Sequence, residues 1–204
     1  MINFLLRTSN RPNGFRRMIT SVYSQKHKDY RLIISADNEE TAEYVKSYNI
    51  SPIMISSIVR RDLNHNPYNL YNNRLMDEVK NGWIMFGDDD DYIPNPDTFG
   101  KIAGICKDID TIYIFRMVDL QNGQVIPGFK TFGKAIQFGD IATPNFVFNA
   151  KWKDTARWQD KRGGDFMFIR DLINNNSGLL KLNFIDLVTY VVDHRGMHGV
   201  KVDI

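Results

Sequence analysis

The chain has 204 residues, of which 43% are hydrophobic, 12% aromatic and 25% charged, a composition that excludes a disordered or fibrous protein and suits one folded domain over residues 1–204. Lys and Arg number 26 and Asp and Glu 24, so the formal charge is only +2. Because this balance is unsuited to neutralising many phosphates, we expect no nucleic-acid partner.

The first half of the chain alternates strand and helix patterns. A buried-strand run at 2–6 is followed by the polar turn RTSNRPNG and by an apolar stripe of period 3.6 at 15–23, which predicts a helix. Strand, helix and strand with short connections predict right-handed βαβ units and a parallel sheet. The further elements expected here are strands at 31–35, 52–59 and 82–86 and helices at 40–48 and 69–80.

The second half is less regular. Its expected elements are helices at 97–106 and 165–174, strands at 111–118, 146–150 and 183–192, and a hairpin turn at Gln121-Asn122-Gly123. Neither a repeat nor a Pro/Ser-rich linker divides the chain, so we expect a single domain.

Two features bear on the compartment in which the protein works. Cys106 is the single cysteine and lies in an apolar stretch, so it cannot form an internal disulfide and is expected to be buried. The apolar run at 2–6 is too short for a secretory signal or a membrane span. We therefore expect an intracellular, cytoplasmic and soluble protein.

Four consecutive aspartates, Asp88 to Asp91, follow the strand pattern at 82–86. Neighbouring unit charges about 4 Å apart repel by about 1 to 4 kcal/mol in a partly hydrated setting, so some partner must offset them. Open parallel sheets bind ligands at the carboxyl ends of their strands, and carboxylates are ligands for hard divalent cations. Mg²⁺ or Mn²⁺, itself holding a phosphate, is the expected partner, and a solvated acidic turn is the alternative.

Three segments, in this order, resemble the GT-A glycosyltransferases, most closely the family 2-like group that uses nucleotide sugars. INFLLRTSNRP with the later SVYSQ is similar to the opening strand, turn and helix, KDYRLIISADN to the second strand, and GWIMFGDDDD to the strand with the Asp-x-Asp signature. The resemblance implies a GT-A (Rossmann-like) α/β fold, a three-layer α/β/α sandwich with a mixed, mainly parallel sheet. It further implies a nucleotide-sugar-binding half at 1–100 and an acceptor-side half at 101–204.

The resemblance also implies where the donor's nucleobase lies. The base is expected between the opening turn, with Thr8, Asn10 and Arg11, and the end of the second strand, where Asp37 matches an acid of the family. Ala36 replaces the acid that commonly precedes it. A carboxylate that accepts the uracil imide N–H favours a UDP-sugar as donor.

In the acidic run, the signature aligns with Asp88, Asp89 and Asp90. By the resemblance Asp88 lies near the ribose, Asp90 binds the Mn²⁺ or Mg²⁺ that bridges the two phosphates, and Asp89 contributes to the donor site with its side chain directed away from the ion. Because four aspartates leave a one-residue ambiguity, Asp91 is a further metal-ligand candidate.

The segment Arg162-Gly163-Gly164-Asp165 precedes a helical pattern and resembles the family's Glu-Asp element. The resemblance implies that Asp165 is the general base that takes the proton of the acceptor hydroxyl. Gly164 stands where the family has Glu, and a helix-capping role for Asp165 is the alternative.

Near the end of the chain, His194 and His198 lie four residues apart in a Gly-rich segment. GT-A enzymes often complete the metal shell with a C-terminal histidine, and His198 matches it best; a surface position is the alternative for either imidazole. Arg195 and Lys201 are candidates to neutralise the leaving diphosphate.

Three aromatic residues, Phe146, Trp152 and Trp158, lie between the acidic run and Asp165. Aromatic faces suit the apolar faces of sugar rings, so these residues are candidates for the acceptor cleft. The alternative is that they belong to the core.

The resulting prediction is a metal-dependent glycosyltransferase that moves a sugar from a nucleotide diphosphate to a hydroxyl of a glycan or glycoprotein. One alternative is a non-catalytic nucleotide- or carbohydrate-binding module on a GT-A-like fold, motivated by Ala36 and Gly164. Another is a sugar nucleotidyltransferase, which would need a Gly-rich basic loop where RTSNRPNG has one Gly.

Two further enzyme classes fit the sequence less well. A haloacid-type phosphatase needs a small residue where Tyr92 stands, and a dinucleotide-binding dehydrogenase needs Gly-x-Gly-x-x-Gly, which the sequence lacks. The small size and the missing membrane segment also resemble the glycosyltransferase modules that large DNA viruses use on capsid glycoproteins.

Overall fold

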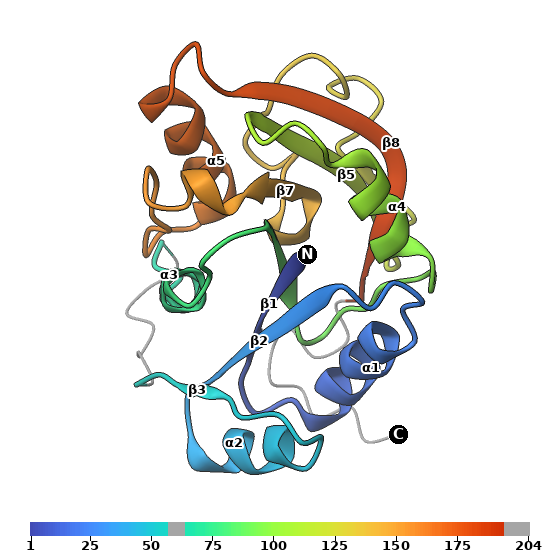
Figure 1. Ribbon diagram of the computed structural model, residues 1–204, viewed down its shortest axis with the longest axis vertical. Coiled ribbons are helices and arrows are strands. Elements are labelled where there is room, and N and C mark those ends of the chain that lie inside the picture. Colours follow the sequence, from blue (N-terminus) through green and yellow to red (C-terminus); the bar gives the residue numbers. More distant parts are fainter. Residues whose placement is uncertain (57–63, 194–204) are drawn as a thin grey trace.

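In the computed structural model, residues 1–56 and 64–193 are described, and eight strands of this part form one mixed sheet (Figure 1). The strands are β1 (Ile2–Thr8), β2 (Tyr30–Ala36), β3 (Ile53–Met54), β4 (Trp83–Asp88), β5 (Thr111–Asp119), β6 (Val125–Ile126), β7 (Phe146–Asn149) and β8 (Lys181–Val192). The helices are α1 (Pro12–Tyr23), α2 (Glu39–Lys46), α3 (Asn69–Asp77), α4 (Thr98–Ile105) and α5 (Gly164–Asn175), with single 3₁₀ turns at 143–145 and 150–152.

The parallel half of the sheet is built around β1. This strand pairs in parallel with β2 on one side and with β4 on the other, and β2 pairs with β3. In register, Thr8 lies opposite Ala36 and Arg7 lies opposite Asp88. The carboxyl ends of the three strands therefore meet at one edge, which brings the opening turn and the four aspartates together and confirms the α/β arrangement expected for this half.

The other half of the sheet is mixed. Strand β7 runs antiparallel to both β4 and β5, β6 folds back on β5 as a hairpin, and β8 lies parallel to β5. The hairpin turns at Gln121-Asn122-Gly123 as expected, and Gly123 adopts the left-handed conformation with φ +69°.

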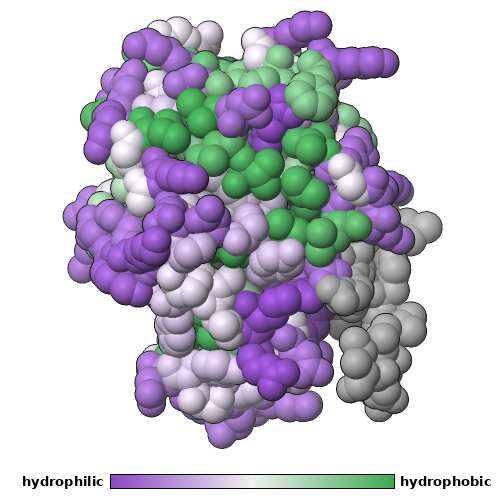
Figure 2. Space-filling model, turned by 90° about the vertical axis from the view of Figure 1, so that its right-hand side faces the viewer, coloured by the Kyte–Doolittle hydropathy of each residue, from purple (hydrophilic) through white to green (hydrophobic). Residues whose placement is uncertain are grey.

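Helices cover both faces of the sheet, which confirms the three-layer α/β/α sandwich (Figure 1). Buried residues of α1, α2 and α4 form one core cluster with the sheet, and those of α3 and α5 form another on the opposite face. Cys106 is buried at the end of α4, and burial raises the pKa of its thiol to about 12. Figure 2, viewed from the side of β8 and α4 in Figure 1, shows hydrophobic side chains gathered there; Ile105, Ile185 and Leu187 are partly buried against the first cluster.

The expected strand at 52–59 is wrong in extent. Strand β3 covers only Ile53–Met54, because it lies at the end of the sheet and pairs only with Ser35 and Ala36 of β2. Residues 57–63 lie outside the described part of the chain. Over the described ranges, no helix is both long and apolar enough to cross a membrane.

Candidate functional site

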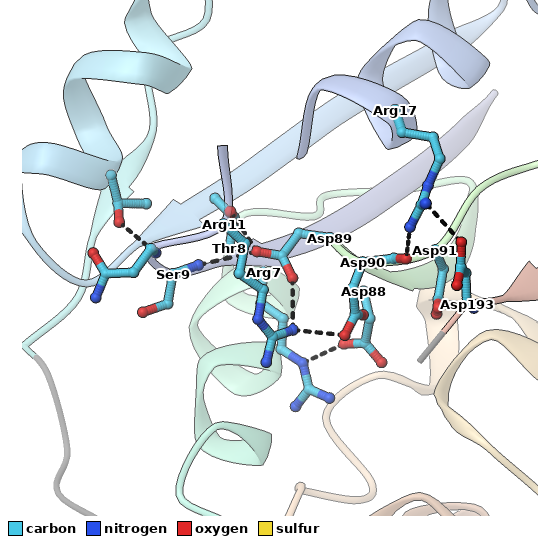
Figure 3. Close-up of polar contacts among 12 residues, drawn as sticks. Arg7, Thr8, Ser9, Arg11, Arg17, Asp88, Asp89, Asp90, Asp91 and Asp193 are labelled. Carbon is cyan, nitrogen blue, oxygen red and sulfur yellow. Dashed lines mark hydrogen bonds and ion pairs between the residues drawn. The ribbon is translucent and has the colours of Figure 1, made fainter. Parts of the chain in front are cut away.

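The acidic loop, defined here as Asp88–Asp91, begins at the last residue of β4 and faces the opening turn at residues 8–11 (Figure 3). Guanidinium groups meet its first three carboxylates. Arg7 donates to the side chain of Asp88, and Arg11 Nη1 donates to Asp89 Oδ1 at 3.0 Å and to Asp90 Oδ2 at 2.8 Å. The repulsion among the aspartates is thus partly offset by cations of the protein itself.

Asp89 connects the loop to the opening turn. Its Oδ2 accepts from Thr8 Oγ1 at 2.6 Å and from the backbone N–H of Ser9 at 3.2 Å. Burial raises the pKa of Asp89 to about 6, although Arg11 and Thr8 act in the opposite direction. Helix α1 approaches the same backbone so closely that a Cβ on Gly14 would stand 2.7 Å from the Asp89 carbonyl oxygen.

The end of β8 supports the loop from the other side. The Tyr190 hydroxyl accepts from the Asp88 N–H at 2.8 Å and donates to the Asp88 carbonyl at 3.2 Å, and the Asp193 N–H donates to Asp91 Oδ1 at 3.0 Å. Burial, with the charges of Asp91 and Asp88, raises the pKa of Tyr190 well above its usual value, so the phenol stays protonated. A Cβ on Gly87 would lie 2.8 Å from this hydroxyl.

A third arginine reaches the far end of the loop. Arg17 donates to Asp193 Oδ2 at 2.6 Å and to the backbone carbonyl of Asp90 (Figure 3). With all groups ionised, the acidic loop and Asp193 place five carboxylates beside three guanidinium groups, which leaves a formal charge of −2. Burial and neighbouring carboxylates raise the pKa of Asp90 and of Asp91, so a further cation would be favoured here.

The donor set of the loop fits a hard divalent cation. Over the described residues, no three His, Cys, Asp or Glu side chains converge on a single metal position. Mg²⁺, however, usually takes one or two carboxylates, several waters and the phosphates of a substrate, not a cage made only of protein groups. The carboxylates of Asp90 and Asp91, the two candidate ligands, match this pattern.

Asp37 follows the end of β2 at the same edge of the sheet. It is 8% exposed, and its carboxylate accepts from Tyr71 OH at 3.2 Å and from Asn38 Nδ2 at 2.8 Å. Asn10 lies nearby, since its Oδ1 accepts from Asn38 Nδ2 at 3.2 Å and its N–H donates to Thr41 Oγ1 at 3.0 Å.

Asp165 lies in the first turn of α5, which follows Gly163 in the left-handed conformation. Burial raises the pKa of Asp165 to about 6, and the charges of Arg7 and Asp88 also act on it, which places this carboxyl within electrostatic reach of the Arg7–Asp88 pair. Asn69 of α3 links the two sides. It accepts from Arg7 Nη1 at 3.4 Å and donates to the carbonyls of residues 159 and 161, just before α5.

Residues 5–172 match the sequence model of Glycosyl transferase family 2, which is more than half of the chain. The chain belongs to glycosyl transferase family 2. A comparison with curated proteins gives no match.

Several solved structures share the fold of this family 2 domain. A crystal structure of S. aureus TarS 1–349 is 17% identical with a TM-score of 0.69 over 94% of this chain and 60% of that one. The mannosyltransferase PcManGT from Pyrobaculum calidifontis, in complex with GDP-Man and Mn²⁺, is 11% identical with a TM-score of 0.65 over 97% and 59%. Glucosyl-3-phosphoglycerate synthase from Mycobacterium tuberculosis, with Mg²⁺ and UDP, is 13% identical with a TM-score of 0.65 over 98% and 74%.

At these identities the likeness concerns the fold. The chain spans about 60% of the length of the TarS fragment and of the mannosyltransferase. GT-A folds with bound nucleotides and Mn²⁺ or Mg²⁺ are thus structurally similar to this family 2 domain.

The structure brings most of the predicted site residues to one edge of the sheet: Thr8, Asn10, Arg11, Asp37, the acidic loop and Asp165. His198, predicted as a metal ligand, lies outside the described residues, as do His194, Arg195 and Lys201.

The aromatic candidates for the acceptor cleft were wrong. Phe146, Trp152 and Trp158 are all buried and belong to the core cluster on the α3 and α5 face. Phe146 and Trp158 stack on each other and on Phe168 of α5, because large flat rings fill the space between sheet and helix.

Sequence reasoning missed the residues that hold the loop in place: Arg7, Arg17, Asn69, Tyr190 and Asp193. One signal was available for the arginines. Four adjacent carboxylates require nearby cations, and Arg7 lies in the first predicted strand, which the structure pairs with the strand that ends in Asp88. No comparable signal marks Tyr190, which lies 102 residues beyond its partner.

Proposed function

We propose that this domain transfers a sugar from a nucleotide diphosphate, with a UDP-sugar favoured, to a hydroxyl group of a glycan or glycoprotein. The observation that carries the proposal is the meeting of the acidic loop, the opening turn and Asp37 at the carboxyl edge of a family 2 domain. Open α/β sheets bind ligands at this edge.

Asp90 and Asp91, with His198, are proposed to hold Mn²⁺ or Mg²⁺, and Asp88 is proposed to lie near the ribose. When bound, the cation would neutralise charge on the donor's diphosphate. Asp89 is already engaged by Thr8 and Ser9, which supports its role in shaping the opening turn instead of ligating the ion.

Asp37 is proposed to accept the imide N–H of uracil. Its carboxylate takes one hydrogen bond from Tyr71 and one from Asn38, and an ionised carboxylate has about four acceptor positions, so capacity for a base remains. A site built for this bond penalises a base that leaves it unpaired. Asp37→Ala should therefore lower the preference for UDP over GDP, and an unchanged preference would contradict the assignment.

Asp165 is proposed as the general base. The acceptor oxygen bonds to the anomeric carbon, the bond from that carbon to the diphosphate oxygen breaks with its electron pair, and the hydroxyl proton passes to the Asp165 carboxylate. A pKa near 6 suits a base that works near neutral pH. Asp165→Asn should slow transfer by about 10²- to 10⁴-fold while leaving UDP affinity nearly intact, and a retained anomeric configuration would contradict this role.

Calorimetry of UDP binding tests the donor site. We expect binding with Mn²⁺ to weaken at least about tenfold when EDTA replaces the metal, and Asp90→Asn to remove most of the metal-dependent affinity. Asp154→Asn is the matched control, because Asp154 is exposed and forms its ion pairs with Lys153 and Arg157 at the surface. Equal affinity with Mn²⁺ and with EDTA would refute the proposed metal site.

Hydrolysis of UDP-sugars with Mn²⁺ in the absence of an acceptor separates an enzyme from a binding module. Binding without any turnover would favour the module. A cytoplasmic location and a role on viral capsid glycoproteins stay predictions.

A further inference from the structure

An exposed aromatic ring stands over the start of α5. Phe138 is 60% exposed, although large aromatic side chains are normally buried. Its ring lies directly on Gly163, where an added Cβ would be 2.2 Å from Phe138 Cε2, and it meets the Phe166 ring edge-to-face at a centroid distance of 6.0 Å. Gly163 has φ +73°, a conformation that favours glycine. Because glycine has no side chain, the Phe138 ring can pack directly on its backbone.

The loop that carries Phe138 is fixed on both sides of it. Asp140 accepts from the Gly128 N–H at 3.0 Å and from the Thr131 hydroxyl. The Phe132 ring packs on the ring of Phe184 in β8, with their centroids 5.6 Å apart. Cζ of the buried Arg116 lies 4.0 Å from the centroid of the Phe132 ring. The ring is thus held in place before any ligand arrives, which lowers the entropy cost of binding against it.

The position of this ring relative to Asp165 indicates its use. Gly163 under the ring and Phe166 at its side flank Asp165 in the sequence. Asn69 joins the segment just before α5 to Arg7, the partner of Asp88. A flat apolar surface therefore lies on the turn of α5 that carries the carboxylate proposed to deprotonate the acceptor. A sugar ring suits such a surface, because C–H groups on its faces can pack on an aromatic ring while the hydroxyls at its edge point toward polar groups.

We propose that Phe138 is an acceptor-binding residue that stacks on the C–H face of a saccharide and so presents one of its hydroxyls to Asp165. The inference rests on the proposed function and narrows the acceptor to a sugar, as opposed to a side-chain hydroxyl of an unmodified polypeptide. The accessible Phe138 thus takes the acceptor-binding role that the sequence suggested for Phe146, Trp152 and Trp158, which are buried.

Saturation-transfer NMR with Mg²⁺ and UDP tests this directly. The probes are methyl glycosides of glucose, galactose, mannose and N-acetylglucosamine, with glycerol as the non-ring alcohol. We expect transfer to ring C–H protons of at least one glycoside in the parent and in Phe138→Trp, and loss of that signal in Phe138→Ala. Phe129→Ala is the matched control, since Phe129 is 81% exposed in the same loop but its ring lies over Arg116.

Kinetics provide the second readout. With the best glycoside as acceptor, Phe138→Ala should raise the acceptor KM by about tenfold or more while UDP affinity, donor hydrolysis and melting temperature stay at parent values. Unchanged acceptor KM and unchanged NMR transfer in Phe138→Ala would overturn the inference, as would transfer to no glycoside in a parent that binds UDP. A parent that neither binds UDP nor hydrolyses donors would instead contradict the proposed function, and the NMR comparison would still decide whether Phe138 binds sugars.

Discussion

Replacing Asp165 by Asn should stabilise the protein at neutral pH. Burial raises the pKa of this carboxyl from its ordinary 3.8 to about 6. A folded-state pKa above the unfolded value means that the native protein binds more protons between about pH 4 and pH 6, so the free energy of unfolding falls as pH rises through that window. Above pH 6 the native state therefore contains a poorly solvated carboxylate.

The size of the effect follows from the shift. About two pKa units correspond to about 2 to 3 kcal/mol at pH 7.5, which Asn avoids because it is neutral. At pH 4 the native carboxyl is protonated and the unfolded one only partly ionised, so parent and Asp165→Asn should differ by only about 0.5 kcal/mol. If Asp165 served only to favour the helix N-terminus, its replacement would instead cost about 0.3 to 1 kcal/mol at neutral pH.

Urea unfolding in EDTA at pH 7.5 and pH 4 measures both values. Asp171→Asn is the control, because Asp171 lies in the same helix and its carboxylate forms an ion pair with the neighbouring Arg170 at 2.8 Å. A variant less stable than the parent at pH 7.5 would refute the reasoning and favour the capping role. With Mn²⁺ in place of EDTA, the parent's transfer rate should rise with pH through about 6, as the proposed base loses its proton.

Three further changes test how the site is supported. Tyr190→Phe leaves the Asp88 N–H and carbonyl without their hydroxyl partner. It should lower the free energy of unfolding in urea by about 1 to 3 kcal/mol and weaken UDP–Mn²⁺ binding. Unchanged values for both would argue that Tyr190 does not support the acidic loop. Gly87→Ala should destabilise by about 1 to 3 kcal/mol, because its Cβ would be 2.4 Å from Cζ of the buried Phe4 and 2.8 Å from the Tyr190 hydroxyl. An unaltered melting temperature would contradict this. Gly164→Ala places a Cβ 2.2 Å from Asn69 Nδ2, so its cost should shrink in an Asn69→Ala background, and strict additivity in this double-mutant cycle would exclude the clash.

The regular elements could be predicted from the sequence because their signals are local. The stripe that buries Phe15, Met18, Ile19 and Val22 appears as α1, and the apolar run before Asp88 appears as β4. Strand β3 was overestimated because an apolar run does not show how many partner residues the neighbouring strand offers.

The parts of the candidate site that could be predicted are those whose meeting follows from the order of the segments in the sequence and the direction of the strands. Once β1, β2 and β4 are parallel neighbours, Thr8, Asp37 and Asp88 must meet at one edge. Burial of Trp158 and exposure of Phe138 could not be predicted in this way, because both are aromatic residues in irregular segments and only the packing of α5 distinguishes them.

The support of the acidic loop by β8 has a consequence for the order in which the protein can become competent. Tyr190 and Asp193 are each 102 residues later in the chain than the groups they bond. At a synthesis rate of about 5 to 20 residues per second, the loop leaves the ribosome about 5 to 20 seconds before these partners exist. A nascent chain, or a product truncated before β8, would carry all four aspartates of the acidic loop and the opening turn but lack the phenol and the amide that shape them. We therefore expect nucleotide binding only once the sheet is complete, even though the four aspartates are present earlier.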